Sequence, residues 1–285
     1  MKVFNNFNLK NYNSYKIDSV CSKAWFPENE QELIKLFSKN SEKKCIVIGN
    51  GNNVILSKMY YDEEFIILNE CFETIVVSGT VIEAEAGATL LQLSEKALEY
   101  SLTGLEVFHD IPSSVGGAVV MNAGTKEGEI KDILLKVRYL DLSDLLIKEM
   151  FKEDIGFEYR NSFFQKQTDK IILKAWFNLE KGEQKEIKAR MDEIKQIRWA
   201  KQPRGYPNCG SVFKRPPGRF VGPMLDELGL KGFTVGGAKI SEKHSGFIVN
   251  FNNATGQDIL DVIDHVKSKV LDKFGVELEV EQRII

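Results

Sequence analysis

Long hydrophobic runs are absent from this 285-residue sequence. No stretch approaches the roughly 18 consecutive apolar residues of a membrane span, and the first residues lack the positive-then-apolar pattern of a secretory signal. Cysteine is scarce and scattered, without CxxC spacing, at Cys21, Cys45, Cys71 and Cys209. We therefore expect a cytoplasmic protein with free thiols.

A strong excess of charge is also absent. The 38 basic and 41 acidic residues leave a net charge of −3, so no overall field favours nucleic acid or an anionic membrane. No grouping of His, Cys, Asp and Glu has the spacing of a metal site. We expect no nucleic acid, membrane or metal partner, and any anion site must be local.

One stretch, residues 110–124 with the sequence DIPSSVGGAVVMNAG, stands out. Pro112 fixes one torsion and removes a donor, whereas Gly116 and Gly117 let the backbone approach a ligand and aim N–H groups at negative oxygens. An ordinary turn would also use two glycines. The combination nevertheless predicts a phosphate cradle.

A second glycine-rich stretch, residues 49–53, follows a short apolar run at 45–48. It is not a Rossmann fingerprint, because the third glycine is missing and the β-branched run 54–56 stands where a helix should begin. Gly and Asn tolerate the left-handed conformations that form anion-binding nests. A hairpin turn is the alternative interpretation.

Periodicity predicts a mixture of helices and many short strands. Helices are expected over 29–37, 90–100, 184–201, 221–228 and 255–274. Strands are expected over 45–48, 54–56, 65–68, 74–77, 81–85, 136–140, 145–150, 170–177, 247–250 and 277–284. Proline and glycine cluster beyond residue 201, which indicates a boundary and a functional loop there.

Six segments together resemble one family, the UDP-N-acetylenolpyruvoylglucosamine reductases. They are Val47–Asn53, Ile111–Gly117 with Met121–Gly124, Glu158–Ser162, Tyr206–Lys214, Gly236–His244 and Glu279–Ile285. The match covers nearly the whole chain. The short loop around residues 206–210 is similar to the shorter, second subtype of the family.

The resemblance implies an α+β chain with a two-part FAD-binding fold of the vanillyl-alcohol oxidase (PCMH) type, followed by a smaller α+β substrate-binding domain. The expected boundaries are 1–70 for the first FAD-binding subdomain, 71–195 for the second, and 196–278 for the substrate-binding domain. The terminal strand, 279–285, is expected to return to the active site.

The implied activity is reduction of the enolpyruvyl group of UDP-N-acetylglucosamine enolpyruvate to UDP-N-acetylmuramate, a step of peptidoglycan precursor synthesis. NADPH donates the hydride and non-covalently bound FAD carries it. The enzyme is expected to be a monomer. The residues implied for cofactor binding are Gly49, Asn50, Gly51, Asn52, Asn53, Ile111, Pro112, Ser113, Ser114, Val115, Gly116, Gly117, Asn122, Ala123 and Gly124.

Three residues are implied in the chemistry by the resemblance. Arg160 would hold the substrate carboxylate in its guanidinium fork, although a surface ion pair is the alternative. Glu281 would act as a protonated donor with a raised pKa, unless it is a solvated residue on a charged strand. Ser211 would give a proton to the carbanionic carbon, and the neighbouring Cys209 is the rival candidate.

The UDP diphosphate is assigned to Lys214 and Arg215, part of the densest cationic cluster beside the expected site. The chain departs from the family pattern at Asp18-Ser19, at Pro223 and at Ser113, where serine would be strained if the position needs a positive φ.

Two rival functions remain open. One is another flavin oxidase or dehydrogenase of the same fold, with the flavin attached through His109. The other is a non-catalytic UDP-sugar or flavin-binding protein.

Overall fold

The structure is a computed structural model that describes residues 1–39 and 44–285. The chain forms two compact units. Unit 1 comprises residues 1–4, 23–50 and 63–198, and unit 2 comprises residues 5–22, 51–62 and 199–285. Each unit is therefore assembled from segments that are distant in sequence, and the boundaries expected from the sequence remain a prediction.

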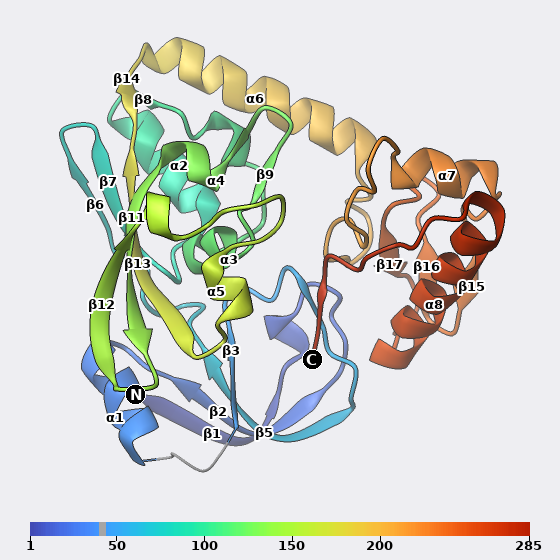
Figure 1. Cartoon of the computed structure of the whole chain (residues 1–285), viewed down its shortest axis with the longest axis horizontal. Helices are drawn as coiled ribbons and strands as arrows, with labels where there is room; N and C mark the ends of the chain where they lie inside the picture. The colour runs from blue at the N-terminus through green and yellow to red at the C-terminus, as the bar shows by residue number, and fades with distance from the viewer. Residues whose placement is uncertain (40–43) are drawn as a thin grey trace. The chain divides into compact units, whose positions relative to one another are not determined.

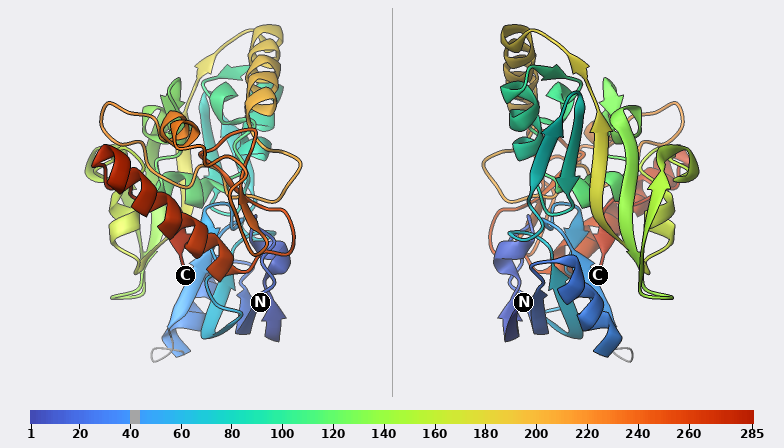
Figure 2. Two further views of the ribbon diagram at one scale, coloured as in Figure 1. Left: turned by 90° about the vertical axis from the view of Figure 1, so that its right-hand side faces the viewer. Right: turned by 90° about the vertical axis from the view of Figure 1, so that its left-hand side faces the viewer.

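Unit 1 is organised around a five-stranded antiparallel sheet with the order β12-β11-β13-β7-β6. Its strands are β6 (Ile75–Ser78), β7 (Val81–Glu85), β11 (Leu134–Asp141), β12 (Leu146–Phe151) and β13 (Lys170–Asn178). The helices α2 (Leu90–Glu99), α3 (Val115–Val120), α4 (Ile130–Ile133) and α5 (Phe163–Lys166) lie on one face of this sheet (Figures 1 and 2). The segment expected to cradle a phosphate is thus packed directly on β-structure.

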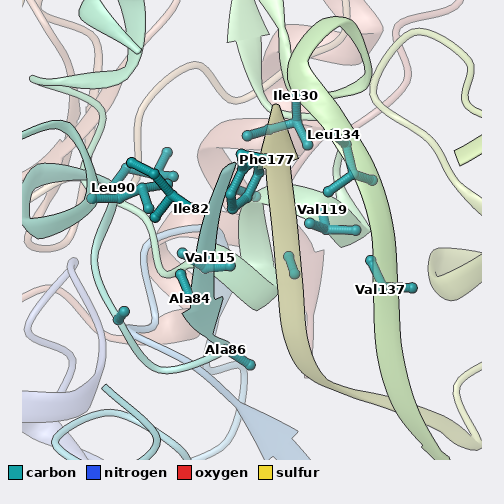
Figure 3. Packing of buried hydrophobic residues seen from close by; sticks show 14 of the residues in the cluster. Ile82, Ala84, Ala86, Leu90, Val115, Val119, Ile130, Leu134, Val137 and Phe177 are labelled. Carbon is teal, nitrogen blue, oxygen red and sulfur yellow. The ribbon is translucent and has the colours of Figure 1, made fainter. Parts of the chain in front are cut away.

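The core of unit 1 fills the space between this sheet and its helices (Figure 3). Side chains alternate along a strand, and Ile82 and Ala84 of β7 accordingly both point into the core. Val115 and Val119 lie four residues apart on α3, so they share one helix face and reach the same cluster as Phe177 of β13. This packing fixes α3 on the sheet.

A second cluster in unit 1 surrounds helix α1 (Glu30–Lys39). Leu33 and Leu36 of α1 pack with Ile66, Leu140 and Leu173. Strand β3 (Cys45–Ile48) runs parallel to β5 (Tyr60–Ile67), with Ile46 opposite Phe65. The strand β3 is therefore paired where it leads into the glycine-rich stretch, and its last residue, Ile48, is buried.

The remaining elements of the first 201 residues are short strands, 3-10 turns and one long helix. They are β1 (Lys2–Asn8), β2 (Val20–Phe26), β4 (Val54–Ile55), β8 (Leu102–Thr103), β9 (Gly124–Thr125), β10 (Gly128–Glu129), β14 (Glu180–Lys181), the 3-10 turns Lys10–Tyr12, Glu106–Phe108 and Lys152–Asp154, and α6 (Gln184–Lys201). One sheet has the order β1-β2-β5-β3, and β14 pairs with β8.

Unit 2 contains a three-stranded antiparallel sheet packed against its longest helix. The elements are α7 (Val221–Glu227), β15 (Thr234–Val235), β16 (Ala238–Ile240), β17 (Ile248–Asn250), α8 (Gly256–Phe274) and β18 (Arg283–Ile284). Helix α8 begins at a capping box formed by Thr255 and Asp258 and ends at Gly275 with a φ of 65°. Strand β18 pairs in parallel with β4.

The five predicted helices are confirmed, within one or two residues at their ends. The predicted strand over 277–284 is wrong, because this segment makes one bridge at Val280 and only a two-residue strand at Arg283–Ile284. It changes partner along its length and so cannot continue a single ladder. Strands β1 and β2 were not predicted, and no helix among the described residues is long and apolar enough to cross a membrane.

Candidate active site

The segment 110–124 of unit 1 turns into helix α3 at Ser114. The hydroxyl of Ser114 accepts a hydrogen bond from the Gly117 amide at 3.3 Å, as an N-cap does. The Gly116 amide donates to the carbonyl of Ala86 at 2.9 Å. Both glycine N–H groups thus have acceptors inside the protein. A role of these glycines in cofactor binding would rest on close backbone approach and remains a prediction.

Ser113 departs from the family pattern, and its φ angle decides whether serine is strained at this position. Among the described residues, the non-glycine positions with positive φ do not include Ser113. Its carbonyl accepts from the Leu90 amide at 2.9 Å, and its hydroxyl donates to the Ser114 carbonyl at 3.0 Å. Serine is therefore accommodated without backbone strain.

Gly49 meets the same segment within unit 1, and Asn50 follows it in the chain. A Cβ atom on Gly49 would lie 2.4 Å from the Ser114 Oγ, so only glycine permits this approach. The Oδ1 atom of Asn50 is buried and has no hydrogen-bond partner. Buried acceptors without a partner are rare in folded proteins, and a bound group with N–H or O–H donors would satisfy this one. This position is therefore compatible with FAD, which carries hydroxyl donors.

The rest of the glycine-rich stretch, Gly51 to Asn53, lies in unit 2. Gly51 has a φ of 64°, and a Cβ there would lie 2.0 Å from the Tyr12 carbonyl oxygen. Asn52 accepts a hydrogen bond from Ser14. The Nδ2 of Asn53 donates to the carbonyl of Glu281 at 3.3 Å. This half of the stretch is therefore tied to the C-terminal segment.

Asn122, which was expected to contact the cofactor, is completely buried with a φ of 43°. Its Nδ2 donates to Glu129 Oε2 and to the Glu158 carbonyl, both at 3.0 Å, and its Oδ1 accepts from the Lys131 amide at 3.1 Å. Its side-chain hydrogen bonds thus connect three backbone and side-chain groups within unit 1. Any contact with a cofactor would have to come from the backbone.

Arg160 lies in the same part of unit 1, and its side chain is 17% exposed. Its Nη2 donates to the Gly124 carbonyl at 2.7 Å and its Nη1 to the Asn122 carbonyl at 3.3 Å. Glu129 Oε1 lies 3.7 Å from Nη1. The guanidinium thus donates to two backbone carbonyls and lies within ion-pair distance of Glu129, so its role in holding the substrate carboxylate stays a prediction.

Ser211 and Glu281 are brought onto neighbouring segments of unit 2. The Glu281 amide donates to the Val212 carbonyl at 2.8 Å, and Phe213 forms a bridge with Val280. Ser211 is exposed, and Glu281 is half-buried. The two segments are therefore paired, with Glu281 opposite Val212, and the serine next to Val212 is accessible to solvent.

Cys209 differs from Ser211 in its access to a ligand. Its Sγ is buried, 3.4 Å from the Val54 carbonyl oxygen and 3.8 Å from that of Gly51. Burial raises the pKa of Cys209 to about 12. The thiol is an inert structural donor, and the geometry favours Ser211 over Cys209.

The two residues assigned to the diphosphate are both engaged in unit 2. Lys214 Nζ lies 2.6 Å from Glu279 Oε1, and the lysine side chain is 18% exposed. The Arg215 guanidinium carbon lies 4.5 Å from the centre of the Phe220 ring, a cation–π arrangement. A diphosphate would have to compete with Glu279 for Lys214.

His109, the residue considered for covalent flavin attachment, is half-buried in unit 1, and its Nδ1 has no hydrogen-bond partner. Burial lowers the pKa of its imidazole. Residues 1–39 and 44–285 contain no group of three or more His, Cys, Asp or Glu that could hold a metal ion.

Sequence reasoning missed two buried residues of unit 2 that support this site, Tyr15 and Gln282. The phenol of Tyr15 donates to Gln282 Oε1 at 2.9 Å. The only sequence signal was a glutamine directly after Glu281, which is too weak to find the pair. Arg160 belongs to unit 1, whereas Ser211, Glu281, Lys214 and Gln282 belong to unit 2.

Comparisons with known proteins match both halves of the chain. Residues 23–146 match the family model described as FAD binding domain. Residues 202–285 match the model described as UDP-N-acetylenolpyruvoylglucosamine reductase, C-terminal domain. These two matches confirm the predicted order of an FAD-binding fold followed by a reductase domain.

Whole-chain relatives agree with these models. The UDP-N-acetylenolpyruvoylglucosamine reductase of Caldanaerobacter subterraneus is 41% identical over 100% of this chain and 94% of its own length. That of Francisella tularensis is 43% identical, covering 97% of this chain and 98% of its own. The crystal structure of the reductase from Thermus caldophilus matches with a TM-score of 0.84 and 32% identity, covering 99% of this chain and 98% of that one. Because the likeness extends over both halves at this identity, the chain belongs to the UDP-N-acetylenolpyruvoylglucosamine reductase family.

Proposed function

We propose that this chain reduces the enolpyruvyl group of UDP-N-acetylglucosamine enolpyruvate to UDP-N-acetylmuramate, with FAD as bound cofactor, NADPH as hydride donor, and Arg160, Ser211 and Glu281 as catalytic residues. The observation that carries the residue assignment is the pairing in unit 2, where the Glu281 amide donates to the Val212 carbonyl at 2.8 Å beside the exposed Ser211.

The cofactor would be held by residues of the two glycine-rich stretches. Asn50 offers its buried, unpartnered Oδ1 to a donor of the bound group, and Gly49 and Ser114 bring the two stretches together. FAD, when bound, supplies the hydride chemistry by taking a hydride from NADPH and passing it to the enolpyruvyl double bond.

The protein residues would stabilise the negative charge that develops on the substrate and would supply a proton to it. As the hydride reaches the terminal carbon, negative charge builds on the neighbouring carbon and its carboxylate. Arg160, fixed by the Asn122 and Gly124 carbonyls, would stabilise this charge electrostatically. Glu281 would help as a protonated hydrogen-bond donor, since an ionised glutamate would repel the carboxylate.

Ser211 would complete the reduction by giving its hydroxyl proton to the carbanionic carbon. One hydride and one proton are thereby added across the double bond, and the serine oxygen recovers its proton from solvent. Exposure of Ser211 suits this role, because the hydroxyl must reach both substrate and water. Lys214 and Arg215 would bind the diphosphate of the substrate.

The experiment is to purify the chain, record its visible spectrum and follow NADPH absorbance with and without the enolpyruvyl substrate. Bound flavin should absorb near ~450 nm, and NADPH oxidation should depend on the substrate. Ser211→Ala should leave the bleaching of flavin by NADPH nearly intact and slow its recovery on addition of substrate roughly 100-fold or more. Equal loss of both steps would show that Ser211 has another role.

The rival functions give different results in the same preparation. Yellow colour that stays in an acid-precipitated pellet would indicate a flavin attached covalently, as the oxidase alternative requires. UDP-sugar binding without turnover would indicate a non-catalytic binding protein. The monomeric state and cytoplasmic location are part of the proposal, and sedimentation and cell fractionation test them.

A further inference from the structure

Gln282 is a buried polar side chain that the catalytic scheme does not use. It is 4% exposed and directly follows Glu281. Its Nε2 donates to the carbonyl of Cys209 at 3.1 Å and lies 3.4 Å from the carbonyls of both Gly210 and Ser211. One amide group therefore faces three consecutive carbonyls of the turn that carries Ser211.

The other end of the Gln282 amide is fixed as well. Its Oε1 accepts the hydroxyl of Tyr15 at 2.9 Å, and Tyr15 is completely buried. The Tyr15 carbonyl in turn accepts from Asn250 Nδ2 at 2.8 Å. A primary amide has both donors and an acceptor, so glutamine can connect the tyrosine hydroxyl to the carbonyls, which a carboxylate or an apolar side chain could not do.

The turn is also held by backbone contacts on its C-terminal side, where Ser211 forms a bridge with Phe247 and the Val212 amide donates to the Gly246 carbonyl at 3.0 Å. Gly210 has a φ of 78° and no side chain, and a Cβ there would have nothing within 4 Å. Its amide donates to Asn208 Oδ1 at 3.1 Å. A glycine at positive φ is the residue most able to move to another conformation. On both sides of Gly210, the Gln282 amide adds a side-chain contact to the carbonyls of Cys209 and Ser211.

We propose that Gln282, held by Tyr15, is a positioning residue that fixes the Ser211 turn against the segment carrying Glu281. This proposal rests on the proposed function of Ser211. The side chain of Gln282 contacts the turn and its backbone is continuous with Glu281. It therefore adds to the backbone contacts of Glu281 with Val212 and of Val280 with Phe213 in setting the spacing between the proton donor and the second electrophile. Misplacement of a catalytic group by about 1 Å is enough to cost roughly 100-fold in rate.

The test compares Gln282→Met, Tyr15→Phe and Ser94→Ala. Methionine keeps the approximate length of glutamine and removes its donors. Tyr15→Phe removes only the hydroxyl that orients the amide and is the milder change. Ser94 is the matched control, since it is a buried polar residue of α2 whose Oγ donates to the Leu90 carbonyl at 2.6 Å and takes no part in the proposed site.

Two measurements are made on each flavin-loaded variant. The first is hydrogen–deuterium exchange of the peptide that contains residues 209–213, which reports order in the turn without any activity. The second separates bleaching of flavin by NADPH from its recovery with the enolpyruvyl substrate. For Gln282→Met we expect faster exchange in this peptide and a recovery step slowed roughly 10- to 100-fold, with bleaching within about twofold of the wild type. Tyr15→Phe should change both in the same direction by a smaller factor.

Unchanged exchange at 209–213, or an unchanged recovery step in Gln282→Met, would overturn the proposal. So would a recovery step slowed equally by Ser94→Ala, which would show that any lost buried hydrogen bond has this effect. Ser211→Ala separates the two hypotheses. If Ser211→Ala slows recovery but Gln282→Met does not, only the positioning role of Gln282 is rejected. If Ser211→Ala has no effect on recovery, the proposed role of Ser211 is rejected, and the positioning role that rests on it is rejected as well.

Discussion

A hydrogen bond of 2.7 Å joins Nη2 of Arg160 to the carbonyl oxygen of Gly124. Nη1 makes a second bond, of 3.3 Å, to the carbonyl of Asn122. The guanidinium proposed to hold the substrate carboxylate is thus fixed to the segment proposed to approach the cofactor. The residue proposed to bind the substrate carboxylate and the segment proposed to bind the cofactor are therefore hydrogen-bonded to each other within unit 1.

Arg160→Lys tests the value of this fixed guanidinium. Lysine keeps the positive charge but loses the planar fork, so it cannot bond both carbonyls and a carboxylate in the same orientation. We expect kcat/KM for the enolpyruvyl substrate to fall roughly 100-fold, with NADPH-driven bleaching of the flavin unchanged. Steady-state and stopped-flow absorbance measure the two quantities. A variant with wild-type kcat/KM would remove Arg160 from the chemistry.

Gly51→Ala should destabilise the protein strongly. The residue has a φ of 64°, and the new Cβ would lie 2.0 Å from the Tyr12 carbonyl oxygen. The conformation alone costs about 1–2 kcal/mol for a residue other than glycine, and the backbone contact adds to this cost. The decrease in the free energy of unfolding, measured by urea denaturation, should therefore exceed about 1 kcal/mol.

Ser113→Gly should have a small effect and is the natural comparison. Ser113 is not among the residues with positive φ, so glycine relieves no strain. It increases the freedom of the unfolded chain and removes the hydroxyl that donates to the Ser114 carbonyl. We expect a loss of about 0.4–1 kcal/mol, with flavin retention unchanged after gel filtration. A gain in stability would mean that the serine is strained after all.

The reactivity of the four free cysteines should follow their burial. Cys21 is fully buried, and burial raises the pKa of Cys209 to about 12, whereas Cys45 and Cys71 are half-buried. The thiolate is the reactive form. At pH 8 we expect iodoacetamide to label Cys45 and Cys71 and to spare Cys21 and Cys209 until the protein is unfolded in urea. Peptide mass spectrometry measures this order, and early labelling of Cys209 would contradict its burial.

Asp141 should contribute to the pH dependence of stability. Hydrogen bonds from Lys148 at 2.7 Å, from Lys170 at 2.8 Å and from Ser143 lower the pKa of its carboxyl. A carboxyl with a lowered folded-state pKa stabilises the protein fully above its unfolded pKa of about 3.9 and loses this contribution as the pH falls below it.

Asp141→Asn should accordingly lower Tm at pH 7 and flatten the fall in Tm between pH 5 and pH 2. Glu99→Gln is the control, because the Lys96–Glu99 pair is largely exposed and exposed pairs contribute little. Differential scanning calorimetry across this range provides the comparison. Parallel Tm curves for Asp141→Asn and the wild type would contradict the assigned role.

Features set by local sequence were predictable. Thr255 and Asp258 form a capping box, which predicts the start of α8. Leu33 and Leu36 have the apolar spacing that predicts α1. Strand β1 was missed because nearly all of its side chains are exposed, so no alternation marks it. The turn into α3 was not foreseen as a helix because glycine is a poor helix former, yet here a Cβ on Gly116 would lie only 3.0 Å from the Ala86 Cβ.

The family resemblance supplied a set of candidate site residues, whose roles stay predictions, and it could not supply their arrangement. Gln282 contacts Tyr15 and the Cys209 carbonyl, partners that are far away in the sequence. No local pattern specifies such a contact, because it depends on which distant segments pack together. For the same reason, the sequence could not predict that Arg160 donates to the Asn122 and Gly124 carbonyls.

The way each unit is assembled has a consequence for biosynthesis. Unit 2 combines residues 5–22 and 51–62 with residues 199–285, so its early segments must wait on the ribosome until the late ones emerge. The buried Tyr15 can contact Gln282 only after the 267 positions that separate them have been synthesised. Folding that depends on such distant contacts is slow and leaves apolar surface exposed in the meantime, so unit 2 is where we expect chaperones to engage the nascent chain.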